Sequence, residues 1–164
     1  MKKLVHGIFG ALFMLGCAAG LSTSASAGGM DMKGQFGWLG VGTAHEIGKG
    51  HYYWIGEFSG TFFADAGPGG TMHNSGVKCP GYNELDFTNK KNTAAGYCTV
   101  LDRDGDKALA NWTCKGDTYK CQGTITWMNG TGKYAKISGS ISFTGVMEVS
   151  HTDGKASGWA IWNR

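Results

Sequence analysis

Residues 137–147 read ISGSISFTGVM, and from residue 137 to residue 145 an apolar residue or glycine alternates with serine or threonine. One face carries Ile137, Gly139, Ile141, Phe143, Gly145 and Met147. Ser138, Ser140, Ser142 and Thr144 fall on the other face. A period of two, with one apolar and one polar face, is typical of a β-strand that buries one side.

The same alternation predicts a strand at residues 52–62, where aromatic side chains and glycines share a face. Further strands are expected at residues 36–46, 71–78, 95–101, 107–114, 121–128 and 156–162. Turn dipeptides such as Asp104-Gly105 and Asn129-Gly130 separate them, and both accept positive φ. The sequence therefore predicts an all-β fold, an eight-stranded antiparallel closed barrel of the calycin-like kind. A barrel leaves no free strand edges, and a two-sheet β-sandwich is the alternative.

Glycine dominates the composition, with 29 among 164 residues, and only 2 residues are proline. Collagen is excluded, because there is no Gly-X-Y period and almost no proline. A disordered chain is not expected, because 41% of residues are hydrophobic and 12% are aromatic. This much glycine also disfavours long helices, since an interior glycine costs about 1 kcal/mol relative to alanine.

The first 27 residues have the features of a secretory signal peptide. Lys2 and Lys3 precede an apolar stretch at residues 4–15, and Ala25-Ser26-Ala27 supplies the small residues that signal peptidase requires. The prediction is an exported protein, periplasmic or secreted, with one domain at residues 28–164. An alternative is a lipoprotein anchored through Cys17, because residues 14–17 (MLGC) loosely resemble a lipobox.

Loss of residues 1–27 would remove two of the 15 basic residues and lower the net charge from +3 to +1. No basic patch is then left to indicate nucleic-acid binding. The chain beyond the signal peptide contains no apolar stretch long enough for a transmembrane helix.

Four cysteines remain beyond the signal peptide, which predicts two disulfides in an exported protein. Cys114 and Cys121 flank residues 115–120 (KGDTYK), a tight hairpin that would place their sulfur atoms opposite each other. We therefore expect a Cys114–Cys121 bridge and, by elimination, a Cys79–Cys98 bridge. A zinc site of four thiolates is the alternative, but the spacing does not form two CxxC pairs.

Residues 129–140 read NGTGKYAKISGS and resemble the GTGKYxxIxG turn and strand of allene-oxide-cyclase-like and dirigent-like barrels. Residues 101–107 (LDRDGDK) and 112–114 (WTC) also resemble segments of exported bacterial members of that superfamily. The resemblance covers about residues 51–162. It implies an eight-stranded antiparallel barrel with an apolar interior, often oligomeric in the plant members, so a homo-oligomer is possible. No catalytic residue of the plant cyclases matches a position here, so their activity is not carried over.

Two groups of polar residues are weak candidates for a metal site. Asp102, Asp104 and Asp106 occupy alternate positions, as calcium ligands do in an EF-hand loop. Gly105 precedes the third aspartate, however, whereas the glycine of an EF-hand follows it. We therefore favour a hairpin tip whose aspartates accept hydrogen bonds from their own backbone. His45 and His51 bracket a turn, but their spacing does not fit a zincin motif. We therefore favour no metal and expect no cofactor.

The abundant aromatic residues suggest a pocket inside the barrel. The candidate pocket residues are Trp54, Phe58, Phe62, Trp112, Trp127 and Phe143. The first hypothesis is a non-enzymatic exported barrel that binds a small apolar ligand in the barrel or at its mouth. A pocket isomerase or cyclase is the second, with Glu57 as its acid, although Glu57 falls on the strand face opposite Trp54. The third is a structural envelope protein with a filled barrel.

Overall fold

The computed structural model describes residues 32–150 and 153–163, so the predicted signal peptide and Cys17 lie outside the described residues. The described chain forms eight β-strands and one short 3-10 helix. The elements are β1 (Gly34–Gly48), β2 (His51–Ala64), β3 (Ser75–Asp86), β4 (Lys91–Leu101), β5 (Lys107–Gly116), β6 (Lys120–Gly130), η1 (Gly132–Tyr134), β7 (Ser140–Ser150) and β8 (Lys155–Asn163).

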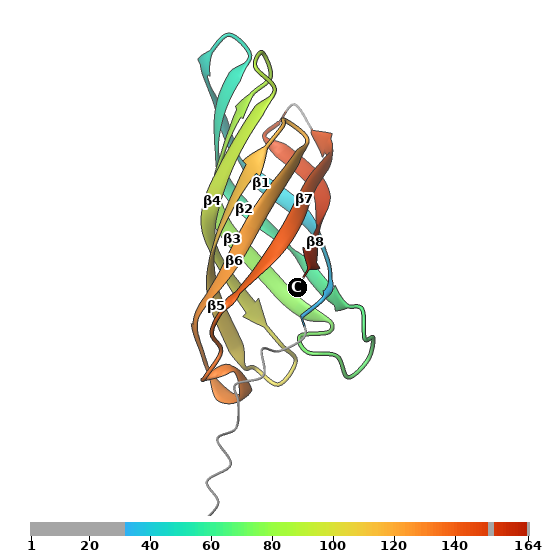
Figure 1. Cartoon of the computed structure of the whole chain (residues 1–164). Helices are drawn as coiled ribbons and strands as arrows, with labels where there is room; N and C mark the ends of the chain where they lie inside the picture. The colour runs from blue at the N-terminus through green and yellow to red at the C-terminus, as the bar shows by residue number, and fades with distance from the viewer. Residues whose placement is uncertain (1–31, 151–152, 164) are drawn as a thin grey trace, which may run out of the picture.

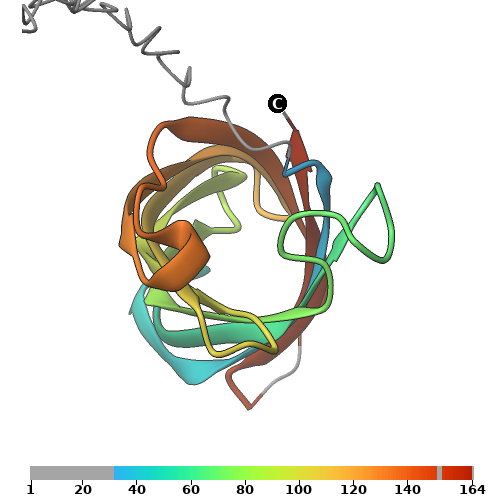
Figure 2. The ribbon, with the colours of Figure 1, turned by 90° about the horizontal axis from the view of Figure 1, so that it is seen from below.

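Each strand pairs antiparallel with the next along the chain, and β8 returns to pair with β1. The closing register runs from Gly34 opposite Trp162 to Val41 opposite Lys155. The result is a closed barrel, which is seen along its axis in Figure 2. The barrel prediction is therefore confirmed, and the sandwich alternative is wrong.

The turns that join β1 to β2, β3 to β4 and β5 to β6 lie at one end of the barrel, at the top of Figure 1, where β7 also ends and β8 begins. We call this the hairpin end. The β1–β2 and β3–β4 hairpins extend beyond the rest of the barrel there. The opposite end, which we call the closed end, carries η1 and the loops that precede β3, β5 and β7.

Two strand boundaries near the middle of the chain differ from the prediction. The strand expected at residues 71–78 begins at Ser75 and continues to Asp86, because Met72 and Asn74 adopt positive φ in the preceding turns. The strand expected at 95–101 begins earlier, at Lys91. Asn83 and Asn92 occupy inward positions there, so the apolar alternation that marks a strand is interrupted.

The strand predicted at 137–147 is displaced by three residues, to Ser140–Ser150. Gly139 has a φ of +92°, and β7 starts only at Ser140. Ile137 is nevertheless buried, because the turn after η1 carries its side chain into the core. The period of two therefore identified the buried face correctly but not the first residue of the strand.

Side chains fill the closed end of the barrel. Phe62 stacks on Trp162 with ring centroids 4.3 Å apart, and Trp127 meets the edge of Trp162 at 6.1 Å. Val77 and Val100 are also fully buried in this core. Large rings and branched side chains thus occupy the width that an eight-stranded barrel provides.

The ring of Trp54 lies directly against two facing glycines, one on β1 and one on β2. Gly42 lies opposite Gly56, and a Cβ atom placed on Gly56 would fall 2.4 Å from Cζ2 of Trp54. No side chain fits between the strand and this ring. These inward glycines therefore make room for the indole of Trp54.

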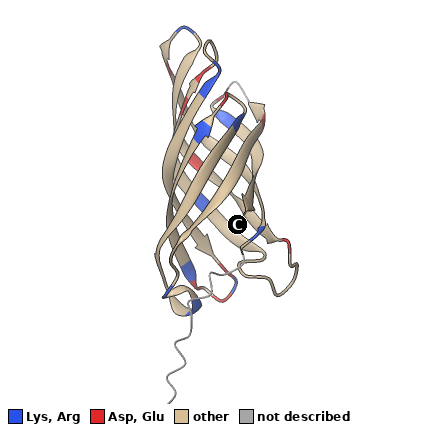
Figure 3. Ribbon diagram, viewed as in Figure 1, with Lys and Arg blue, Asp and Glu red and all other residues tan. Residues whose placement is uncertain are grey.

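Charged side chains are sparse on the barrel, and wide parts of the strand walls carry none (Figure 3). Apolar side chains on the outer faces include Leu39, Val41, Ile55, Phe63 and Ile161. Among the described residues, no helix has the length and hydrophobicity needed to cross a membrane.

Candidate ligand-binding cavity

A cavity of about 600 Å³ occupies the hairpin end of the barrel. Its lining includes one residue from each hairpin turn at this end, namely Gly50, Phe87, Tyr119 and Gly154. The floor is formed by residues that border the packed core, among them Phe36, Ile125 and Trp162. The barrel is therefore filled at one end and hollow at the other.

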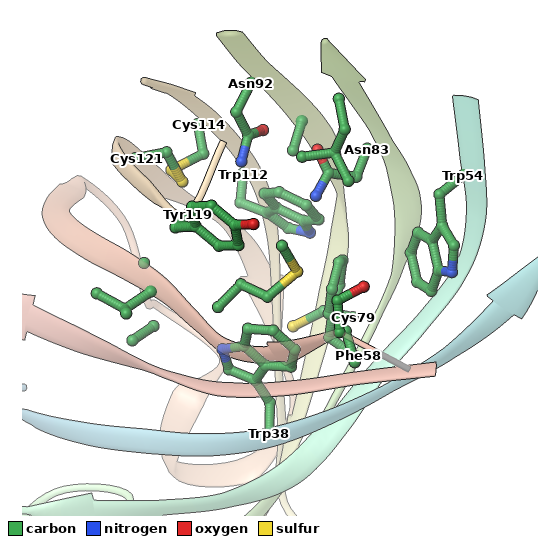
Figure 4. Close-up of a pocket in the computed structure, with 18 of the residues that line it drawn as sticks. Trp38, Trp54, Phe58, Cys79, Asn83, Asn92, Trp112, Cys114, Tyr119 and Cys121 are labelled. Atoms are coloured by element: carbon green, nitrogen blue, oxygen red, sulfur yellow. A yellow bond between two sulfur atoms is a disulfide. The ribbon is translucent and has the colours of Figure 1, made fainter. Parts of the chain in front are cut away.

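Four rings form a connected aromatic cluster on the cavity wall, and they are Trp38, Trp54, Phe58 and Trp112. Phe58 is central, with centroid distances of 5.1 Å to Trp38, 4.8 Å to Trp54 and 5.8 Å to Trp112. The indole N–H of Trp54 donates to the backbone oxygen of Gly154 at 2.8 Å. These contacts fix the rings against the wall and leave their open faces to the cavity (Figure 4).

Four of the six candidate pocket residues lie on this wall, and they are Trp54, Phe58, Trp112 and Phe143. Phe62 and Trp127 do not line the cavity. Both pack against Trp162 in the core of the closed end. The alternation therefore predicted correctly that they face inward, but they lie at the filled level of the barrel and not at the level of the cavity. The sequence gives the face of a strand residue but does not show which level of the barrel is hollow.

Both predicted disulfides are present, Cys79–Cys98 and Cys114–Cys121. The register on either side of Cys79 places it directly opposite Cys98, with Cα atoms 4.1 Å apart. Cys114 and Cys121 are diagonal neighbours rather than opposite residues, because Cys121 pairs with Gly116. All four cysteines line the cavity, so the two bridges cross-link its wall.

One part of the wall is polar. Asn83 on β3, Asn92 on β4 and Trp112 on β5 line the cavity, and the Oδ1 atoms of both asparagines and Nε1 of Trp112 are buried with no hydrogen-bond partner. Polar atoms buried in proteins are normally hydrogen-bonded. The sequence analysis missed both asparagines, because an inward asparagine weakens the strand pattern that would reveal it.

Three rings surround the mouth of the cavity. Tyr52 meets the edge of Phe87 at a centroid distance of 5.9 Å, and Phe87 meets Tyr119 at 6.2 Å. These residues come from β2 and from the turns after β3 and β5. Tyr119 is half exposed, and Figure 4 shows its ring extending over the cavity.

Glu57 does not face the cavity. It lies on the outer face of β2, where Ser59 Oγ donates to Glu57 Oε1 at 3.2 Å and Lys78 Nζ lies 3.8 Å away. The described lining contains no aspartate, glutamate or histidine. Its titratable groups are the phenols of Tyr52 and Tyr119 and the ammonium of Lys155, which pairs with Asp153.

The three aspartates of the β4–β5 turn hydrogen-bond the chain itself, as expected for a hairpin tip. Asp102 Oδ1 accepts from the backbone N–H groups of Asp104 and Asp106, at 2.8 and 3.2 Å. The ammonium of Lys133 binds the carboxylates of Asp102 and Asp104. A lysine ammonium thus occupies the space between these carboxylates where a cation would bind.

Lys133 and Asp102 change each other's pKa. Burial favours the neutral form of Asp102, but hydrogen bonds from Lys133 and from the backbone outweigh it and lower the pKa of this carboxyl. The same bonds to Asp102 and Asp104 raise the pKa of Lys133. Burial, and then the charge of Asp102, raises the pKa of the neighbouring Tyr134 to about 12.

The two histidine candidates are not brought into one site. His45 pairs with Tyr53 in the β1–β2 ladder, whereas His51 Nε2 lies 2.8 Å from Glu84 Oε1 on β3. The described residues contain no cluster of three or more histidine, cysteine, aspartate or glutamate side chains suited to a metal ion.

Comparisons with family models, with curated proteins and with solved structures find no match to this chain. The resemblance to allene-oxide-cyclase-like barrels stays a prediction from its motifs. The two disulfides are consistent with an oxidising, exported environment.

Proposed function

We propose that this protein is an exported binding protein that takes up a small, mainly apolar ligand through the hairpin end of the barrel. The observation that carries the proposal is the cavity of about 600 Å³ with its aromatic wall. Sites for small molecules typically have volumes of about 300–1,000 Å³ and combine apolar walls with a few polar groups. A barrel with a purely structural role would instead be filled by its own side chains at both ends.

The alternative of a pocket isomerase or cyclase receives less support. Proton transfer needs an acid or base within hydrogen-bond reach of the reacting atom. Glu57 is on the outside, and the described lining offers only phenols and a paired lysine. Binding without chemistry is therefore the better explanation of this cavity.

The first test identifies a natural ligand. Native mass spectrometry of the protein purified from its own host reports a co-purified molecule and the number of subunits together. We expect an added mass in the range of a small organic molecule, and this mass should disappear after organic extraction.

The second test blocks the cavity and uses two adjacent alanines. Ala94 points into the cavity, whereas Ala95 points outward on the same strand. Ala94→Phe should reduce the affinity for the neutral fluorescent probe N-phenyl-1-naphthylamine at least tenfold, because the new ring occupies space that the probe needs. Ala95→Phe adds the same ring outside the barrel and should leave the affinity unchanged. Equal probe binding by both variants and the parent protein would exclude the cavity as the site.

A further inference from the structure

We infer that the ligand carries one uncharged oxygen, a carbonyl or a hydroxyl, which is held by Asn83, Asn92 and Trp112. The inference rests on the proposed function and specifies the chemical class of the ligand. It requires that the three side chains share one wall, that they lack other partners and that the wall disfavours charge.

The strand registers place the three residues on one continuous part of the wall. Leu85 on β3 pairs with Asn92 on β4, so Asn83 and Asn92 are diagonal neighbours on the inward face. Trp112 pairs with Gly96, which pairs with Gly81, and a Cβ atom on Gly81 would lie 2.9 Å from Cζ2 of Trp112. The indole therefore extends across β4 to reach β3. Figure 4 shows both carboxamides projecting toward the Trp112 ring.

Asn92 and Trp112 are buried, Asn83 is half-buried, and each has a buried polar atom without a partner. Asn92 and Trp112 are each 7% exposed, and Asn92 Oδ1, Asn83 Oδ1 and Trp112 Nε1 make no hydrogen bond. Leaving such groups unpaired costs about as much as a lost hydrogen bond, so apolar residues would suit an empty or hydrocarbon-filled cavity better. A ligand carbonyl or hydroxyl oxygen can accept from the indole N–H of Trp112 and from an amide N–H₂. The two Oδ1 atoms are acceptors, so only a hydroxyl, which also donates, can pair with one of them.

The electrostatics of the wall favour a neutral group over a carboxylate. Asn83, Asn92 and Trp112 supply dipoles but no charge. The described lining holds one cation, Lys155, which belongs to the β7–β8 hairpin and is paired with Asp153. A carboxylate placed at the asparagines would be buried without a counter-ion, which is costly.

The test compares three probes that share a naphthalene body. They are 2-acetylnaphthalene, which has a carbonyl, its isostere 2-isopropenylnaphthalene, which has a methylene in place of the oxygen, and 2-naphthoate, which is charged. Isothermal titration of the intact protein should give about tenfold tighter binding for the ketone than for the alkene, the effect of one hydrogen bond to a buried donor. The carboxylate should bind most weakly of the three.

Asn83→Leu/Asn92→Leu should reduce the preference for the ketone over the alkene without abolishing it, because the indole N–H of Trp112 is then the one donor that remains of the three side chains, while alkene binding is retained or improved. Asn111→Leu is the matched control, because Asn111 is an exposed asparagine on the outer face of β5. It should keep the full preference. The ratio measured on the unaltered protein is a test in itself and does not require any variant to fold.

The outcomes separate the two proposals. If neither neutral probe binds, the proposed function fails. If ketone and alkene bind the unaltered protein equally, or the asparagine double variant keeps the full preference, the inference about the oxygen is overturned and the cavity proposal stands. Tightest binding of the carboxylate would also overturn it, because it would show an anion site.

Discussion

Trp54 illustrates how single residues shape the cavity. Its ring packs on Phe58, its N–H is bonded to Gly154, and glycines 42 and 56 leave the space that it occupies. A tryptophan side chain fixed at both its face and its nitrogen cannot swing inward to fill the barrel. The glycines on β1 and β2 therefore help to keep the cavity open.

Gly56→Ala tests this role. The added methyl group would collide with the Trp54 ring and with the backbone of β1, so we expect a loss of about 1–3 kcal/mol in the free energy of unfolding. Urea denaturation measures it. Gly37→Ala is the control, because a Cβ there meets no atom within 4 Å. Its stability should be unchanged or up to about 1 kcal/mol higher, since alanine restricts the unfolded chain. Equal losses in both variants would contradict the steric argument.

At the scale of the elements, an ion pair joins two turns of the closed end. The turn between β4 and β5 presents Asp102 and Asp104, and Lys133 of η1 bonds both carboxylates. The backbone N–H of Lys133 also donates to Asp106 at 3.1 Å. Segments about 30 residues apart in sequence are thereby held together below the packed core.

Lys133→Met should lower the stability near pH 7, because it leaves the buried carboxylate of Asp102 without its cation, although solvent weakens the pair at the half-exposed lysine. The lowered pKa of Asp102 means that its ionised form stabilises the fold above about pH 4 and that this contribution is lost as the pH falls through the folded-state pKa. Without Lys133 that pKa rises, so acid unfolding should begin at a higher pH.

Circular dichroism between pH 2 and 7 measures the shift. Lys136→Met serves as the control, since Lys136 is an exposed lysine of the same turn. An acid midpoint that moves equally in both variants would show that general charge, rather than the pair with Asp102, is responsible.

The limits of sequence reasoning also appear at this scale. Strands with clean alternation, such as β5 with its buried residues at every second position, were predicted to within about two residues. β3 and β4 were predicted too short, because Asn83 and Asn92 face inward and look like turn residues in a one-dimensional pattern. The two asparagines that make part of the cavity polar therefore also interrupt the sequence pattern by which β3 and β4 could be predicted.

The whole molecule divides into a filled end and a hollow end. Val77, Val100 and Ala108 belong to the filled end and are almost completely buried. In the hairpin end, β1 continues past Val41, where its ladder with β8 stops, and pairs from Thr43 onward only with β2 among the described strands. The sequence predicted a barrel with inward aromatic residues, but the level of the cavity depends on how eight strands align, which no local pattern specifies.

Hydrogen exchange should show this division. Backbone amides of β4 and β5 around Val100 and Ala108 should exchange most slowly, because they surround the packed core, and those of residues 43–50 should exchange fastest among the strands. Mass spectrometry of exchanged peptides measures both. Binding of 2-acetylnaphthalene should slow exchange mainly in the hairpin end. Uniform protection along the barrel would contradict the division.

The position of the disulfides makes the stability of the cavity wall depend on the redox state of the four cysteines. Both disulfides line the cavity, and by loop entropy Cys79–Cys98 contributes about 3.3 kcal/mol and Cys114–Cys121 about 2.5 kcal/mol. The wall of the cavity therefore depends on two cross-links that form only when cysteine thiols are oxidised. If the proposed function is right, the chain with free thiols should have a less stable cavity wall and should bind an apolar ligand less tightly than the oxidised protein.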